Sequence, residues 1–219
     1  MNGNKLSDGN WQFLDDHNSA AAKGYIESGA IFNQKDWRNA RYRYTLWRTW
    51  DSNLPRISFV MLNCSKGNHF ELTPTSEYCD DIARNGLLIK GERVLFGSVE
   101  VVNLFAFRSP KPVDMKNEKI DVIGTNNDDY IKAALKRSKV VIVAWGEDGK
   151  YQNRDKSVLN LINIMGHKPY RIAVTSKYYP YHPYGILKNR YRLFKAGEDR
   201  LKFVERCFGE YVERPKHHP

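Results

Sequence analysis

Two asparagines and one histidine stand at positions in the sequence where side chains commonly do chemistry. Asn63 directly follows the apolar run 57–62, and Asn103 closes a second apolar run. His182 belongs to a His-Pro loop that follows a further apolar segment, residues 170–175. Ligands bind at the carboxyl ends of strands in open α/β sheets, because loops and helix N-termini converge there. We therefore expect these three side chains to meet around one pocket.

Each of these residues also has a purely structural interpretation. A single buried asparagine most often caps a loop, and a single His-Pro most often forms a turn. Asp128 and Asp129 are carboxylates that stand at an expected helix start, where capping and the helix dipole explain them better than catalysis. The functional interpretation depends on the amides and the imidazole occurring together.

Four apolar runs predict the strands that position these residues. The runs are almost continuously apolar, which is typical of strands covered on both faces, and helical patterns alternate with them. The expected strands are residues 57–62, 94–103, 140–145 and 170–175, and the expected helices are 73–86, 126–138, 157–165 and 198–211. The sequence thus predicts an α/β fold, a three-layer sandwich with a central, mainly parallel four-stranded sheet.

The chain divides into three parts by composition. Residues 1–40 are polar and predict an N-terminal arm or cap, with a short helix near residues 19–28; residues 41–212 form a single α/β catalytic domain; residues 213–219 form a disordered tail. Within the domain, residues 37–50 alternate aromatic and basic side chains and predict a strand. This strand is either an edge strand with solvated arginines or a rim that contacts phosphates, and the sequence leaves both open.

Composition limits the classes of partner. The formal net charge is +10, from 35 basic and 25 acidic residues, and aromatic residues make up 13% of the chain. Such a surface favours phosphates and stacked bases. Three cysteines without metal spacing predict no metal site and no disulfide framework, and we expect no cofactor. No run is long enough to span a membrane and no secretory signal is recognisable, so we expect a cytoplasmic protein without a membrane partner.

Several short motifs resemble a bacterial family known only as a domain of unknown function. They lie at residues 59–65, 73–75, 102–108, 123–128, 144–146 and 182–183. The hallmark words of that family are L-N-P-S, N-L-F-A-x-R, A-W-G and H-P-L-Y, and the resemblance covers residues 41–190 in order. This chain differs at three motif positions, with Cys64 in place of proline, Thr73 in place of aspartate and Tyr184 in place of leucine.

The order of these motifs also resembles the uracil-DNA glycosylase superfamily. By that resemblance the fold is uracil-DNA glycosylase-like, Asn63 positions the attacking water, and Asn103 reads a base that has left the helix. His182 would then stabilise the departing base, and Phe70, or else Tyr78, would stack on it.

Taking a base out of the stack also requires phosphate clamps and an inserted side chain. The candidates for DNA binding surround the same loops: Arg108, Lys111, Lys177, Lys188, Arg190 and Arg192 for phosphates, and Tyr184 or Ile186 for the vacated stack. A solvated basic face is the structural alternative for each of them.

The resulting hypothesis is a metal-independent DNA glycosylase that excises a modified base. Hydroxymethylated or glucosylated cytosine of phage DNA is the suggested substrate, so that the abasic sites formed would serve phage defence. The expected partner is double-stranded DNA with modified bases, and no obligate protein partner is inferred. Two alternatives stay open: a non-catalytic nucleic-acid-binding module, and an enzyme that acts on free nucleotides.

Overall fold

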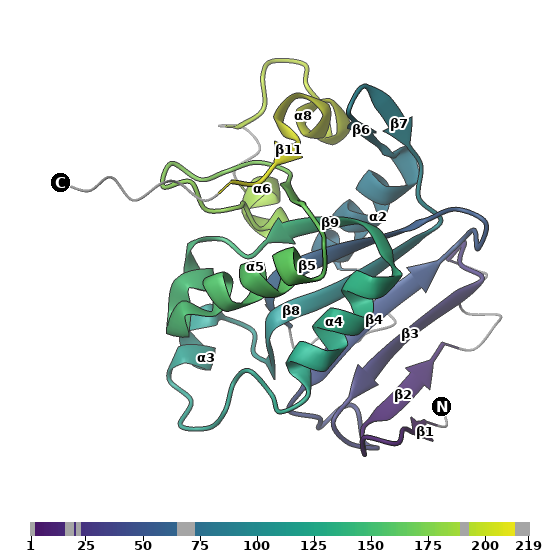
Figure 1. The fold of residues 1–219 in the computed structure, drawn as a ribbon, viewed down its shortest axis with the longest axis vertical. Helices are drawn as coiled ribbons and strands as arrows, with labels where there is room; N and C mark the ends of the chain where they lie inside the picture. Colours follow the sequence, from purple (N-terminus) through teal and green to yellow (C-terminus); the bar gives the residue numbers. More distant parts are fainter. Residues whose placement is uncertain (1–2, 16–19, 21–22, 65–72, 189–192, 213–219) are drawn as a thin grey trace.

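The computed structural model describes residues 3–15, 20, 23–64, 73–188 and 193–212 (Figure 1). The helices are α2 (Pro74–Asn85), α3 (Pro112–Lys116), α4 (Asn127–Arg137), η1 (Glu147–Asn153), α5 (Arg154–Ile164), α6 (Pro183–Lys188) and α8 (Arg200–Cys207). The strands are β1 (Asn4–Lys5), β2 (Trp11–Leu14), β3 (Glu27–Phe32), β4 (Arg43–Thr49), β5 (Arg56–Cys64), β6 (Leu87–Ile89), β7 (Glu92–Val94), β8 (Ser98–Arg108), β9 (Ser138–Ala144), β10 (Pro169–Arg171) and β11 (Gly209–Glu210).

Within these residues the main sheet is nine-stranded and mixed, in the order β1-β2-β3-β4-β8-β5-β9-β10-β11. Its neighbouring strands β8, β5, β9 and β10 are parallel to one another, and each overlaps one of the four predicted strands, although β8 begins later than predicted and β10 ends already at Arg171. The predicted α/β class is therefore confirmed. The predicted sheet size is wrong, because antiparallel strands extend the parallel centre on both sides.

The N-terminal segment supplies three of those additional strands. Strands β1, β2 and β3 pair in sequence with one another and then with β4, so the described part of residues 1–40 continues the sheet and is not an irregular cap. Phe13, Ala30 and Phe32 explain the difference, because they add apolar surface to the same core as the central strands. The predicted helix near residues 19–28 overlaps β3 from Glu27 onward, while residues 19, 21 and 22 lie outside the described residues.

Helices cover both faces of the sheet, as a three-layer sandwich requires (Figure 1). Strand β5 alternates between the two cores: Phe59 and Met61 face the core that includes α2 and α8, whereas Val60 and Leu62 face the core of α4 and α5. Since both faces of β5 are buried, the continuous apolar run that predicted it follows directly from its central place.

Local signals account for the helix boundaries. Helix α2 begins after Thr73, whose side chain accepts a hydrogen bond from the Ser76 amide in a capping box, and Pro74 occupies its first position. Gly86 ends it with a φ of 73°, a conformation that favours glycine. Helices α4, α5 and α8 are found where sequence predicted them, although α8 ends earlier, at Cys207, before the short strand β11.

Strand β4 contradicts the edge-strand interpretation of the segment 37–50. It lies between β3 and β8, so it is an interior strand, and its two arginines, Arg43 and Arg48, are buried instead of solvated. The Arg48 guanidinium lies 3.7 Å from the Asp80 carboxylate of α2. Pairing with a carboxylate is the usual condition for burying such a charge.

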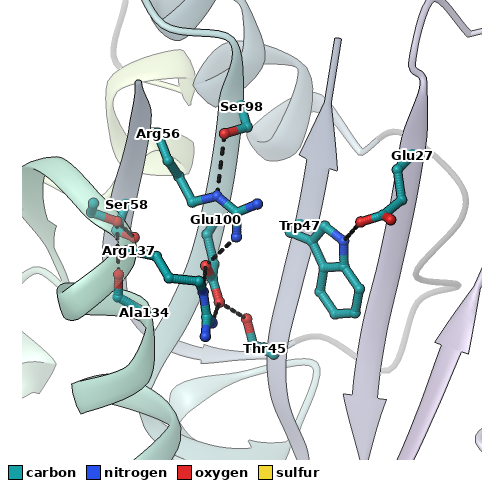
Figure 2. A network of polar contacts seen from close by, with 10 residues as sticks. Glu27, Thr45, Trp47, Arg56, Ser58, Ser98, Glu100, Ala134 and Arg137 are labelled. Carbon is teal, nitrogen blue, oxygen red and sulfur yellow. Dashed lines mark hydrogen bonds and ion pairs between the residues drawn. The ribbon is translucent and has the colours of Figure 1, made fainter. Parts of the chain in front are cut away.

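A buried carboxylate links the strands at the amino ends of β5 and β8 (Figure 2). Glu100 is fully buried and accepts hydrogen bonds from Thr45 at 2.8 Å, Arg56 at 2.7 Å and Arg137 at 2.6 Å. These contacts join β4, β5 and α4 around one residue of β8. The network therefore fixes the end of the sheet opposite the predicted site.

We expect Glu100→Gln to lower the free energy of unfolding by about 3 kcal/mol, because it removes one partner from a buried charge network. Glu205→Gln is the matched control, since Glu205 forms an exposed pair with Arg93 and its loss should change stability by no more than about 0.5 kcal/mol. Urea unfolding of both variants measures the difference. Equal effects would contradict a structural role for the Glu100 network.

Candidate functional site

The carboxyl ends of the parallel strands form one edge of the sheet, which we call the carboxyl-end rim. It is marked by the last residues of these strands, Cys64, Arg108, Ala144 and Arg171. The chain leaves β5 for β8 on one side and returns to β9 on the other, so the strand order reverses between β5 and β9. Ligands in open α/β sheets bind at such a point, outside the carboxyl ends of the strands.

Asn63 lies at this reversal point. Met61 pairs with Ala144 in register, which puts Asn63 level with the residues that follow β9. The Asn63 Nδ2 donates to the Ser109 carbonyl at 2.9 Å and to the Cys64 carbonyl at 3.2 Å. These bonds orient the half-buried amide. The Asn63 Oδ1 has no hydrogen-bond partner among the described residues, so it is available to a ligand or a water.

Asn103 does not close its strand, contrary to the sequence prediction. Strand β8 continues to Arg108, because residues 104–107 are as apolar as those before Asn103 and pack into the same sheet. Asn103 is 1% exposed, and its Nδ2 lies 3.3 Å from the Cys64 Sγ. The Asn103 Oδ1 has no hydrogen-bond partner in the described part of the chain. Asn103 is therefore close to Asn63, but it is buried below the carboxyl-end rim.

Two buried side chains that the sequence did not single out for the site support β8 at this level. The Asn127 Nδ2 donates to the carbonyls of Asn103 and Leu104, both at 3.0 Å, and the Arg154 Nε donates to the Leu104 carbonyl at 2.9 Å. Arg154 also pairs with Asp128, so this carboxylate serves a structural contact, in line with its non-catalytic interpretation. In the sequence, Asn127 and Arg154 stand at helix starts, and nothing in that position indicates that they would support β8.

The loop after β10 brings His182 to the same rim. The Tyr181 amide donates to the Ala173 carbonyl and the Gly146 amide to the Pro180 carbonyl, at 2.9 and 2.8 Å, so the loop folds back onto the end of β9. A Cβ built on Gly146 would lie 4.0 Å from the His182 Cβ. The structure therefore places Asn63 and His182 at adjoining strand ends.

The protonation of His182 follows from its surroundings. Its Nδ1 lies 3.2 Å from the Tyr184 amide and accepts that hydrogen bond, so the proton of the neutral ring belongs on Nε2. Burial lowers the pKa of His182 to about 4, without the help of a carboxylate. At neutral pH the side chain is thus an uncharged hydrogen-bond donor.

The structure supports neither Phe70 nor Tyr78 as the side chain that stacks on a base. Tyr78 is fully buried within the core beneath α2, where burial raises the pKa of its hydroxyl, so it is inaccessible to a base. Phe70 lies outside the described residues. Arg190 and Arg192, two of the predicted phosphate contacts, also lie outside them.

Two residues that were predicted to contact DNA are buried, so the prediction is wrong for them. Ile186 is fully buried because α6 turns it into the core, so it cannot enter a base stack. Arg108 is 3% exposed, and its guanidinium donates to the carbonyls of Trp37 at 2.5 Å and Ala40 at 3.0 Å. Arg108 therefore holds the neighbouring loop instead of a phosphate.

Four predicted DNA contacts are exposed. Lys111 lies at the start of α3, directly after the end of β8, and Lys177 lies in the loop after β10, paired with Glu147 at 2.8 Å. Tyr184 is 50% exposed, and the Lys188 Nζ lies 4.8 Å from the centre of its ring. These side chains leave the surface around His182 basic and aromatic.

The described part of the chain also contains a cavity outside the predicted site. A cavity of about 840 Å³ is lined by Asp81 and residues 194–201, between α2 and the start of α8, and contains none of the predicted site residues. Within the described ranges, no group of three histidine, cysteine or acidic side chains is arranged to hold a metal. No helix among those residues has the length and apolarity needed to cross a bilayer.

The fold and the site thus describe a mixed α/β protein with two amides and an imidazole near the carboxyl-end rim. The family model described as "Protein of unknown function (DUF1643)" matches residues 43–184, well over half of the chain, and the protein belongs to that family. The match spans β4 to α6 and includes Asn63, Asn103 and His182. No curated protein and no solved structure was found to be similar.

The lowered pKa of His182 predicts how stability depends on pH. The unfolded chain takes up a proton below about pH 6.5, whereas the folded protein takes it up only near pH 4, so the stability is fully present above pH 6.5 and declines as the pH falls toward 4. Comparing unfolding of the protein and of His182→Gln across this range isolates the contribution. A ring that titrates near pH 6.5 by NMR would contradict the assignment.

Proposed function

We propose that this protein is a DNA N-glycosylase that removes a modified base. The observation that carries the proposal is the placement of Asn63 and of a neutral, Nε2-protonated His182 at adjoining strand ends, beside the point where the strand order reverses. The uracil-DNA glycosylase-like order of motifs supports the same reaction. The net charge of +10 favours a polyanionic substrate.

The chemistry of glycosidic cleavage suits such a pair. The bond between C1′ of the sugar and the base nitrogen breaks, and its electron pair leaves with the base. A water oxygen bonds to C1′, and the proton lost from that water passes to the base or to solvent. Catalysis of this step requires a donor where the anion develops and a water held in position, more than a strong acid or base.

His182 would supply the donor. Because the imidazole is neutral, it transfers no proton at pH 7, but its Nε2–H can donate a hydrogen bond to an oxygen of the departing base. A fixed donor in a partly desolvated site stabilises charge more strongly than water does. The Tyr184 amide keeps the ring in the required tautomer.

Asn63 would hold the water. Its Nδ2 is committed to the Ser109 and Cys64 carbonyls, which leaves Oδ1 as the acceptor that orients an attacking water. An amide is a poor base, so the substrate must already carry a base that leaves readily. A modified cytosine of phage DNA, hydroxymethylated or glucosylated, is the proposed substrate class, and phage defence is the proposed role.

One observation favours a second candidate, a DNA-binding module without catalysis. Asn103, the proposed base reader, is 1% exposed beneath Cys64, so a base cannot reach it in this conformation. Base recognition by Asn103 therefore needs Cys64 and its surroundings to move. The two candidates share the DNA-binding surface and differ only in base release.

The test uses Asn63→Ala and His182→Gln on DNA that contains glucosylated hydroxymethylcytosine, with mass spectrometry of the released base. We expect each variant to lower the rate of base release by about 10²- to 10³-fold, as loss of one group that stabilises a transition state does, with little change in DNA affinity. Asn163→Ala and His167→Gln are matched controls on other surfaces. Base release that is absent from the wild-type protein, with DNA binding intact, would favour the binding module.

A further inference from the structure

We propose that Arg43, together with Arg38 and Arg41 of the preceding loop, binds the phosphate backbone of DNA beside Asn63. We call these three residues the arginine site. The choice of DNA as partner rests on the proposed function, while the anion site itself rests on the contacts described below. All three lie in the segment 37–50, for which the sequence left a rim that contacts phosphates as one of two open interpretations.

Arg43 is a buried cation that has no charged partner among the described residues. It begins β4 and is 8% exposed, yet its Nε has no hydrogen-bond partner among the described residues, and no carboxylate there pairs with its guanidinium. Burying a charge without a partner is costly, so proteins normally pair such groups. The other buried arginine of β4, Arg48, has its carboxylate in Asp80. Arg43 is therefore suited to an anionic ligand.

A second guanidinium strengthens the positive potential at this point. Burial and the positive charge of Arg43 both lower the pKa of Arg108, which shows that the two cations lie close together. The Arg108 guanidinium donates hydrogen bonds to the Trp37 and Ala40 carbonyls. An anion at Arg43 would thus interact favourably with both arginines.

The loop between β3 and β4, residues 33–42, adds exposed cations. Arg108 anchors its backbone from within, and the Asp36 carboxylate accepts hydrogen bonds from the Arg38 amide and the Asn39 side chain inside the loop. Arg38 and Arg41 remain exposed, and the Arg38 guanidinium lies 4.7 Å from the Trp37 ring centre. A rigid loop that presents arginines is suited to a regular row of phosphates.

The arginine site adjoins the candidate active site. The Phe32–Arg43 pair and the bridge between Tyr42 and Phe107 place the start of β4 at the carboxyl-end rim. The Cys64 Sγ donates to the Arg43 carbonyl at 3.1 Å, and Cys64 directly follows Asn63. A strand whose base lies at Asn63 would therefore run its phosphates along Arg43 and on toward Arg41 and Arg38.

The test measures the affinity of the full chain for a fluorescein-labelled duplex of unmodified bases over a series of salt concentrations. Each phosphate contact contributes about one unit to the slope of log K against log salt. We expect the slope to fall by about one for Arg43→Gln and by about two for Arg38→Gln/Arg41→Gln. The matched control, Lys136→Gln/Lys139→Gln, removes two exposed cations at the opposite edge of the sheet and should leave the slope unchanged.

A second readout separates a ligand-binding arginine from a structural one. Arg43→Met removes an unpaired buried charge, so it should keep or raise Tm while DNA affinity falls. Wild-type slopes in both the Arg43→Gln and the Arg38→Gln/Arg41→Gln proteins would overturn the proposal, as would a lower Tm of Arg43→Met with unchanged affinity. Because the probe contains no modified base, these results do not depend on whether the protein is a glycosylase.

Discussion

Strand β5 is hydrogen-bonded along both edges and buried on both faces, and the site depends on that constraint. Its neighbours β8 and β9 fix its register, so its last residues, Asn63 and Cys64, have little freedom. The register shift between these two residues turns the chain toward the end of β8, where Ser109 binds both of them. The position of Asn63 is thus set by a strand that is paired along both of its edges.

The polar groups at the two ends of the parallel strands have different surroundings. At the amino ends, Glu100 is surrounded by Thr45, Arg56 and Arg137, and its charge is balanced within the protein. At the carboxyl ends, the Asn103 Oδ1 and the Arg43 Nε lack partners in the described residues. Buried atoms elsewhere in these residues, such as the Arg48 Nη2, also lack partners, so these two support a ligand site only together with their place at the edge where ligands are expected.

Sequence reasoning recovered what local patterns encode. The apolar runs predicted the parallel strands, and Thr73, Pro74 and Gly86 predicted the limits of α2, because these features act over a few residues. It failed where distant segments decide the outcome. Arg43, Arg48 and Arg108 look like surface cations in sequence, and only the pairing of β4 between β3 and β8 buries them. Asn103 was predicted to close its strand, but the apolar residues 104–107 continue β8 to Arg108.

The central claim is that nucleic acid binds along the carboxyl-end rim. Hydrogen–deuterium exchange with and without a DNA duplex tests it most directly, because it reports on every loop at once. The account predicts that DNA slows exchange in residues 33–42, 108–116 and 174–188, and leaves the opposite edge, residues 50–56 and 90–97, unchanged. Protection confined to the opposite edge, or absent from all the rim loops of a DNA-saturated protein, would contradict the account.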